Sequence, residues 1–356
     1  MGLNRGHEKF YEIWQGASKN QVAQRAMHKL KDVTGFADHG AAKTNTLIMD
    51  WLRQRDEQRP FYLFAHYIDA HNPLKAPYPY RFQYLTESLK KRVDMDKIWQ
   101  IADNPLLCLS DNLTLNDFEI EALIALYDEE INYLDAKVGE LIDWLKTENI
   151  FHNTLFILTA DHGEHWGEQG LYSHVASLHE PITHIPLIVH YPEVFRVSTE
   201  VEGFAQLVDI MPTVLEAAMI ADESSNRRGK SLFRTETPAR HPFVIAEWEG
   251  RVPYFIQNRS KKNGESRVPE FVSQKQAMIR EGDFKLISRE DGDLKLYDLK
   301  NDLGENHNLA DEMCDLAASL KEKLDKHIQK IQQKSEDESY QLTEQVLKNL
   351  KDLGYM

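Results

Sequence analysis

The stretch that decides the fold is residues 153–192, NTLFILTADHGEHWGEQGLYSHVASLHEPITHIPLIVHYP. It opens with an apolar run at residues 155–158, which is rich in strand-forming residues and short enough to be a fully buried parallel strand rather than a helix. A second apolar run, at residues 186–189, indicates the next strand. Ligands bind just outside the carboxyl ends of the strands in open α/β sheets, so the polar loop between the two runs is the expected functional site.

Acidic and imidazole side chains are concentrated in that loop, beginning with Asp161 and His162 directly after the first run. An ionised carboxylate and a neutral imidazole are both ligands for divalent cations, and the end of a rigid strand fixes their direction. Gly163 lets the backbone turn sharply there. We therefore expect Asp161 and His162 to be metal ligands. The alternative is an exposed polar loop in which His162 has only a structural role.

The motifs in this stretch resemble those of the sulfatase branch of the alkaline-phosphatase superfamily. Members have a strand followed by T-[AS]-D-[HN]-G-E, then G-E-x-G-L, then a Lys or His, and then a [VI]-P-L-I-V strand. The resemblance implies a metal-dependent sulfuric ester hydrolase, with Ca²⁺ expected and Mg²⁺ or Mn²⁺ as alternatives. It also implies an alkaline-phosphatase-like α/β fold, a mostly parallel sheet flanked by helices, with a small C-terminal antiparallel sheet. The matching elements here are residues 159–164 (TADHGE), residues 167–171 (GEQGL), His174 and residues 185–189 (IPLIV).

A second segment carries the same resemblance. Residues 61–65 form an apolar run, a predicted core strand, which ends in the sequence HYIDAHNP at residues 66–73. Sulfatases have a similar segment, P-F-F-L-F-x-H-x-x-x-P-H-x-P, whose second histidine touches the sulfate group; the matching position is His71. The resemblance thus makes His71 and His174 the catalytic candidates, as hydrogen-bond donors to sulfate. The alternative for His71 is a loop histidine capped by a neighbouring carbonyl, and Ala70 departs from the family, which often has Pro there.

Helical periodicity marks the segments before the central strand. Residues 41–54 have an amphipathic pattern. A long helix is predicted to begin near Thr114, whose spacing to Asp117 is like that of a capping box. Further along the chain, Asp209 is placed to cap a helix.

Three regions are expected from these patterns. Residues 1–250 are predicted to be the sulfatase-type α/β catalytic domain, incomplete at its N-terminal side. Residues 251–310 are predicted to be a small antiparallel subdomain, because residues 276–299 alternate as short strands with tight turns and end in a sulfatase-like L-Y-D-L sequence. Residues 311–356 are predicted to be a charged helical tail on the surface.

Composition and charge bound the function. The 356-residue chain has 42% hydrophobic residues, 28% charged residues and a formal net charge of −15, which is typical of an acidic globular protein. This charge argues against nucleic acid or an anionic membrane as the main partner. Cys108 and Cys314 form no disulfide framework or metal motif. No apolar run reaches the ~18 residues of a membrane span, and no signal peptide is evident. A cytoplasmic location is expected if Met1 is the true start.

Two motifs that sulfatases carry are not found. The family uses a front strand that ends in paired aspartates, which complete the metal site, and a nucleophile motif [CS]-x-[PA]-x-R whose Cys or Ser is oxidised to formylglycine. Ser88 and Ser224 precede an Arg at the required spacing, but Lys90 and Asn226 replace the Pro or Ala. No Asp-Asp pair follows an apolar run. The chain therefore resembles the back two thirds of a sulfatase, and an N-terminal segment or a companion chain is the expected partner.

Three functions remain open. The favoured one is a sulfatase that acts on a sulfate ester and has little activity as this chain alone. The second is a related phosphoester or phosphonate hydrolase, or a phosphoethanolamine transferase, because these share the D-H-G-E loop. The third is a non-catalytic chain that binds sulfated ligands or partners a front-half polypeptide. The coding sequence upstream of Met1 distinguishes them, because it would show the nucleophile motif, a Thr nucleophile or neither.

Overall fold

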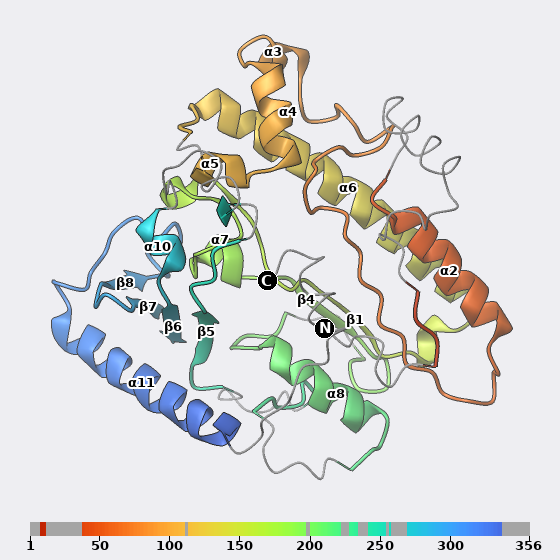
Figure 1. The fold of residues 1–356 in the computed structure, drawn as a ribbon. Helices are drawn as coiled ribbons and strands as arrows, with labels where there is room; N and C mark the ends of the chain where they lie inside the picture. Colours follow the sequence, from red (N-terminus) through yellow and green to blue (C-terminus); the bar gives the residue numbers. More distant parts are fainter. Residues whose placement is uncertain are drawn as a thin grey trace. The chain divides into compact units, whose positions relative to one another are not determined.

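The computed structural model describes residues 8–11, 38–110, 113–196, 200–221, 228–233, 241–253, 256–257 and 269–336 (Figure 1). The chain separates into two compact units, Gly2–Phe151 and His152–Met356. We call them the N-terminal unit and the C-terminal unit and describe each by itself. No helix within the described ranges is long and apolar enough to cross a membrane.

The N-terminal unit is built around the long helix α6 (Asp117–Thr147). This helix was predicted, but it is capped by Asn116 and not by Thr114. The Asn116 side chain accepts the backbone N–H groups of Phe118 and Glu119, and the Glu119 carboxylate accepts the N–H of Asn116. The cap is a reciprocal capping box, shifted by two residues from the expected one. The other helices are α2 (Ala41–Gln54), α3 (Glu87–Lys90), α4 (Met95–Asp103) and α5 (Leu106–Ser110).

Helix α2 confirms the amphipathic helix predicted at residues 41–54, and it lies beside α6 (Figure 1). Its apolar face buries Ile48 and Leu52. A polar contact fixes the pair, because Asn45 Nδ2 donates to the carbonyl oxygen of Lys137 at 2.8 Å. Asn45 is itself almost fully buried, so this hydrogen bond satisfies a group that water does not reach.

The strand predicted at residues 61–65 is wrong for this structure. These residues alternate between half-buried and exposed positions, as a strand would, but they are not assigned to a strand. A strand is defined by a hydrogen-bonded partner, and no described segment pairs with this one. Tyr62 and Phe64 are each 58% exposed, which is unusual for two large aromatic residues so close in the sequence.

In the C-terminal unit, strand β1 (Phe156–Thr159) pairs with β4 (Leu187–His190). The pairing is antiparallel, which corrects the expected parallel sheet. A parallel pair needs a crossover of about a dozen residues or more, usually a helix, whereas the intervening segment holds a short hairpin and the four-residue helix α7 (Glu180–Thr183). The two strands are also only partly buried. The apolar runs indicated strands but not their direction.

The small C-terminal antiparallel sheet is confirmed. Its strands follow in the order β5-β6-β7-β8, and each pair is antiparallel. Strand β5 lies before residue 250, so the sheet begins earlier than the predicted subdomain. Besides β1 and β4, the strands of this unit are β2 (His165–Trp166), β3 (Tyr172–Ser173), β5 (Val244–Trp248), β6 (Gln276–Glu281), β7 (Phe284–Arg289) and β8 (Leu294–Asp298). Its longer helices are α8 (Ile210–Ala217) and α11 (Cys314–Glu336).

Helix α11, in the segment predicted to be a charged helical tail on the surface, packs one face on this sheet (Figure 1). Its apolar residues at positions 317, 320 and 324 are almost fully buried against Ile279, Leu286 and Leu296 of the sheet. The high charge of the segment hid this stripe, because the charged residues between the apolar positions face solvent. Residues 337–356 of the predicted tail lie outside the described residues.

Asp209 does not cap helix α8 with its side chain, although it precedes the helix. Its buried carboxylate accepts the backbone N–H groups of Gln206 and Lys230 and contacts His241 Nε2 at 2.9 Å. These partners lie on segments that join the helix to the sheet. Asp209 therefore connects loops on either side of the helix. The sequence predicted a helix cap at this position, but the side chain has this other role.

Two buried carboxyl groups in the N-terminal unit have raised pKa values. Burial raises the pKa of Glu130 to about 8, although its Oε1 accepts the backbone N–H of Lys75 at 2.6 Å. Burial, followed by the charge of Asp38, raises the pKa of Asp69 to about 6. Both groups therefore keep a proton in the folded chain at pH values where an unfolded chain has lost it.

We expect the free energy of unfolding to fall as the pH rises from about 5 to about 8. The pKa of Glu130 is about 8 in the folded chain and near 4.5 when unfolded, so the folded state binds the extra proton in this interval. By linkage the contribution of Glu130 to this fall is about 3.5 kcal/mol. The Glu130→Gln variant keeps the acceptor for Lys75 and should lose most of this pH dependence in urea unfolding. Glu121→Gln, exposed on the same helix, is the control. An unchanged slope in Glu130→Gln would contradict the assignment.

Candidate functional site

The predicted site loop is fixed immediately after strand β1. The backbone N–H of Gly163 donates to the carbonyl oxygen of Ile182 in helix α7 at 2.9 Å. A Cβ atom at position 163 would lie 2.0 Å from the carbonyl oxygen of Pro181. Glycine is required here because the backbone of the loop is in direct contact with the backbone of α7.

The ring of His162 is oriented by its own backbone. Its Nδ1 lies 2.9 Å from the carbonyl oxygen of Gly163, so Nδ1 carries the proton and donates it there. The lone pair is then on Nε2, which lies 3.8 Å from Oδ2 of Asp161. Metal-binding histidines commonly donate their other N–H to a backbone carbonyl, and two metal–ligand bonds of roughly 2.0–2.5 Å would span this gap. Asp161 and His162 are arranged as two ligands of one cation would be.

His174 lies against His162, with ring centroids 4.2 Å apart and planes inclined by 24°. Its Nδ1 lies 3.0 Å from Oε2 of Glu164, a carboxylate that is almost fully buried. Burial works to lower the pKa of His174, but the hydrogen bond to Glu164 and the charges of Glu164 and Asp161 outweigh it and raise the pKa. His174 therefore keeps a proton more readily than an ordinary histidine, and it can donate to an anion.

A divalent cation would find only part of its ligands here. Within the described ranges, no group of three or more His, Cys, Asp or Glu side chains is placed to hold a metal ion. Asp161 and His162 are two, whereas Ca²⁺ takes six to eight ligands and Mg²⁺ takes six. The carboxylate of Asp161 is 62% exposed, so further ligands have access to it. The pair fits a partial metal site and not a complete one.

His71, the other catalytic candidate, belongs to the N-terminal unit. Its Nδ1 lies 2.9 Å from the carbonyl oxygen of Asn72, and its backbone N–H donates to Ile68. Ala70 has a φ of 75°, a left-handed conformation that proline cannot adopt. The departure from the family at this position therefore matches a different loop backbone. That His71 shares a pocket with Asp161, His162 and His174 stays a prediction.

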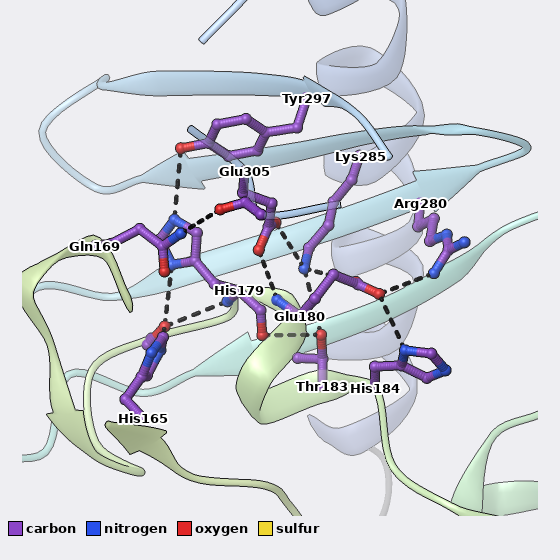
Figure 2. A network of polar contacts seen from close by, with 12 residues as sticks. His165, Gln169, His179, Glu180, Thr183, His184, Arg280, Lys285, Tyr297 and Glu305 are labelled. Atoms are coloured by element: carbon purple, nitrogen blue, oxygen red, sulfur yellow. Dashed lines mark hydrogen bonds and ion pairs between the residues drawn. The ribbon is translucent and has the colours of Figure 1, made fainter. Parts of the chain in front are cut away.

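Other histidines of the loop belong to a buried polar network (Figure 2). His165 Nε2 and His179 Nδ1 both contact the hydroxyl of Ser177, at 2.7 and 3.0 Å, and Tyr297 of strand β8 contacts His179 Nε2 at 3.5 Å. Burial, together with the positive charge of Lys285, lowers the pKa of His179 to about 3. This ring is neutral and both of its nitrogens have partners, so it helps to hold the loop in place.

An ion-pair cluster lies next to that network (Figure 2). The fully buried Lys285 Nζ of strand β7 lies 2.9 Å from Oε1 of Glu180 and 3.0 Å from Oε1 of Glu305. Arg280 lies 3.1 Å from the other oxygen of Glu180. Burial raises the pKa of Glu305, while Lys285 opposes the rise. Two cations and two carboxylates therefore balance one another, with Lys285 and Glu305 fully buried and Arg280 28% exposed.

The sequence assigned no role to Glu164 or Lys285. Glu164 is part of the D-H-G-E motif, and this motif could have pointed to a functional role for it. The contact between Glu164 and His174, however, depends on how the loop folds back. Lys285 lies in an alternating strand pattern at residues 284–287, where a lysine is ordinarily on the solvent face. No local pattern distinguishes a buried lysine from an exposed one.

Two family models match the chain. A model described as Sulfatase matches residues 4–220. A model described as N-sulphoglucosamine sulphohydrolase, C-terminal, matches residues 167–334, which include the sheet β5–β8 and most of α11. The two models overlap over the loop that carries His174.

Similar proteins bear sulfatase names. The chain is 25% identical to the uncharacterized sulfatase YidJ of Escherichia coli (strain K12), over 91% of this chain and 61% of that protein. It is 24% identical to arylsulfatase K of Rattus norvegicus, over 77% of this chain and 50% of that protein. The chain therefore spans about half to three fifths of the length of these relatives.

A solved structure supports the fold. The phosphonate monoester hydrolase of Agrobacterium radiobacter matches with a TM-score of 0.62 at 21% identity, over 82% of this chain and 60% of that one. This likeness, with the mixed helices and strands and the small antiparallel sheet, confirms the predicted α/β fold class. The strand direction of β1 and β4 remains the exception noted above.

The contact between His174 and Glu164 gives a pH prediction. The carboxylate raises the pKa of His174, so Glu164→Gln, which removes the negative charge but keeps an oxygen acceptor, should lower that pKa. Titration of the His174 ring by NMR measures the change. Glu168→Gln is the matched control, because Glu168 contacts His165 and not His174. Equal His174 pKa values in the wild type and Glu164→Gln would show that Glu164 is not its charged partner.

Proposed function

The chain belongs to the sulfatase family, within the alkaline-phosphatase superfamily, and we propose that it is a metal-dependent sulfuric ester hydrolase. The observation that carries the proposal is the pair Asp161 and His162, with Nε2 of His162 presented to the Asp161 carboxylate. The stacked His174, held by Glu164, supplies a proton-bearing ring beside the pair. A cation site next to a hydrogen-bond donor is what a sulfate group requires.

In this proposal each residue has one task. Asp161 and His162 hold the cation, and the cation when bound neutralises the oxygens of the sulfuryl group. His174 donates a hydrogen bond to the sulfate, which its raised pKa favours. His71 is proposed as a second donor on the grounds of the resemblance. Gly163 fixes the direction of the ligand pair.

The proposed ion is the one that the resemblance implies. Ca²⁺ was expected from the resemblance, with Mg²⁺ or Mn²⁺ as alternatives. The carboxylate of Asp161 suits all three ions, because Ca²⁺, Mg²⁺ and Mn²⁺ prefer oxygen ligands. The imidazole of His162 does not distinguish between them, so Ca²⁺ stays the first choice. Comparison of the three ions in one binding assay tests this order.

We also propose that another polypeptide segment completes the site. The ligand count supports this, because Asp161 and His162 are only two ligands. The partial burial of β1 and β4 supports it as well, since Ile188 on β4 is 56% exposed. Tyr62 and Phe64 of the N-terminal unit have similar exposure. Apolar residues in this state mark surfaces that another segment covers. The segment is an N-terminal extension or a companion chain, and it would bring the nucleophile.

The second candidate is a phosphonate or phosphate ester hydrolase. Its support is the likeness to a phosphonate monoester hydrolase, whose name states that activity. A protonated His174 and a cation would bind either ester, because sulfate and phosphonate present similar oxygens. A non-catalytic chain that binds sulfated ligands is the third candidate. Turnover of aryl sulfate and of aryl phosphonate esters, measured side by side, separates the three.

The activity test compares the chain with its Asp161→Ala variant. We expect the 356-residue chain alone to hydrolyse a chromogenic aryl sulfate no faster than Asp161→Ala, with or without divalent metal, because the proposal places the nucleophile and the further ligands on another segment. A longer version that carries the sequence encoded upstream of Met1 should show metal-dependent turnover. In that version Asp161→Ala should reduce turnover by about 100-fold or more, as expected for a lost metal ligand.

His152→Ala is the control, because His152 is exposed and outside the site. Robust metal-dependent turnover by the 356-residue chain alone would show that a residue within it is the nucleophile. Binding of aryl sulfate without turnover in the longer version would favour the non-catalytic candidate.

A further inference from the structure

Helix α7 depends on residues far away in the sequence. It has four residues, and His179 at its N-cap position makes no side-chain cap. A single helical turn is unstable by itself, and its first N–H groups need acceptors. Glu305 supplies one, because its Oε2 accepts the backbone N–H of Glu180 at 2.6 Å. A carboxylate at a helix N-terminus is also favourable electrostatically. Glu305 therefore caps α7 from a position 125 residues along the chain.

Lys285 joins the same helix to the antiparallel sheet. Its ammonium contacts the carboxylate of Glu180 at 2.9 Å and the hydroxyl of Thr183 at 3.3 Å, the first and last residues of α7 (Figure 2). It also contacts Glu305 at 3.0 Å, the residue that caps the helix. One buried cation thus connects both ends of α7 and its cap to strand β7.

Helix α7 in turn supports the turn at Gly163. A Cβ atom at position 163 would lie 2.0 Å from the carbonyl oxygen of Pro181, and the backbone N–H of Gly163 donates to the carbonyl oxygen of Ile182. Asp161 and His162 immediately precede this contact. A displacement of α7 therefore moves the backbone that directs their side chains.

We propose that Lys285 is a positioning residue for the turn that carries Asp161 and His162, acting through helix α7. The small C-terminal sheet is then part of the site machinery, because it fixes the direction of the ligand pair. The inference rests on the proposed function only in assigning metal binding to the turn. The mechanical link from Lys285 to Gly163 is independent of metal and substrate.

The test measures the turn directly in the 356-residue chain without metal or substrate. The variant is Lys285→Met with Glu305→Gln, which removes one charge of each sign and keeps an oxygen acceptor for the N–H of Glu180. Amide hydrogen exchange is measured for peptides covering residues 159–166 and for strands β6 and β7. The ring resonances of His162 and His174 are recorded by NMR. Lys323→Met is the matched control, because Lys323 of helix α11 forms an exposed ion pair with Glu281 at the end of strand β6.

We expect exchange in residues 159–166 to become about tenfold faster in the double variant, as for a local coupling of this kind. The rings of His162 and His174 should shift, while exchange in β6 and β7 and all signals of Lys323→Met stay as in the wild type. Unchanged exchange in residues 159–166 would overturn the proposal. So would an equal rise in β6 and β7, because Lys285 would then stabilise the unit without positioning the turn.

A second variant covers the case in which the double variant does not fold. Thr183→Val has nearly the same shape and leaves every charge in place. It removes the contact with Lys285 and also the hydrogen bond that the hydroxyl donates to the carbonyl oxygen of His179. It should raise exchange in residues 159–166 in the same direction, and wild-type exchange would overturn the proposal. Because no activity is measured, a failed sulfatase assay leaves this result intact, and a failed exchange test leaves the assignment of the sulfatase site intact.

Discussion

Lys285 places a full positive charge in a part of the C-terminal unit from which water is excluded. Removing an ammonium ion from water costs several kcal/mol, and this is offset only when opposite charges and hydrogen-bond acceptors surround it. Here the partners are Glu180, Glu305 and Thr183. They come from the loop between β1 and β4 and from the segment after β8. The packing of the loop on the sheet is therefore fixed by the need to keep this one charge neutralised.

The local part of the candidate site could be predicted from the sequence. Asp161, His162 and Gly163 are adjacent, so their chemistry and the need for a turn are visible in three consecutive residues. His174 was identified only through the resemblance to sulfatases. Its partner Glu164 and the supporting Lys285 could not be predicted, because both depend on contacts formed only after the chain folds back. Whether His71 joins the others remains a prediction, since it lies in a different compact unit.

The elements of the fold could be predicted better than their pairing. The helices at α2 and α6 and the strands β6, β7 and β8 have clear periodicity, and they are present. The predicted direction of β4 relative to β1 was wrong, because an apolar run indicates that a segment is buried and carries no information on strand direction. The apolar stripe of α11 was missed for a related reason. A high density of charged residues indicates exposure on average, while three well-spaced apolar residues are enough to attach a helix to a sheet.

The order in which the ribosome releases the chain gives the distant capping of α7 a consequence in time. Glu180 and Lys285 are 105 residues apart. At a synthesis rate of roughly 5–20 residues per second, about 5–20 s pass between the synthesis of Glu180 and the synthesis of Lys285. Glu305, which caps the helix, is synthesised later still. The turn that bears Asp161 and His162 is thus synthesised well before the residues that complete it, which follow on its carboxyl-terminal side.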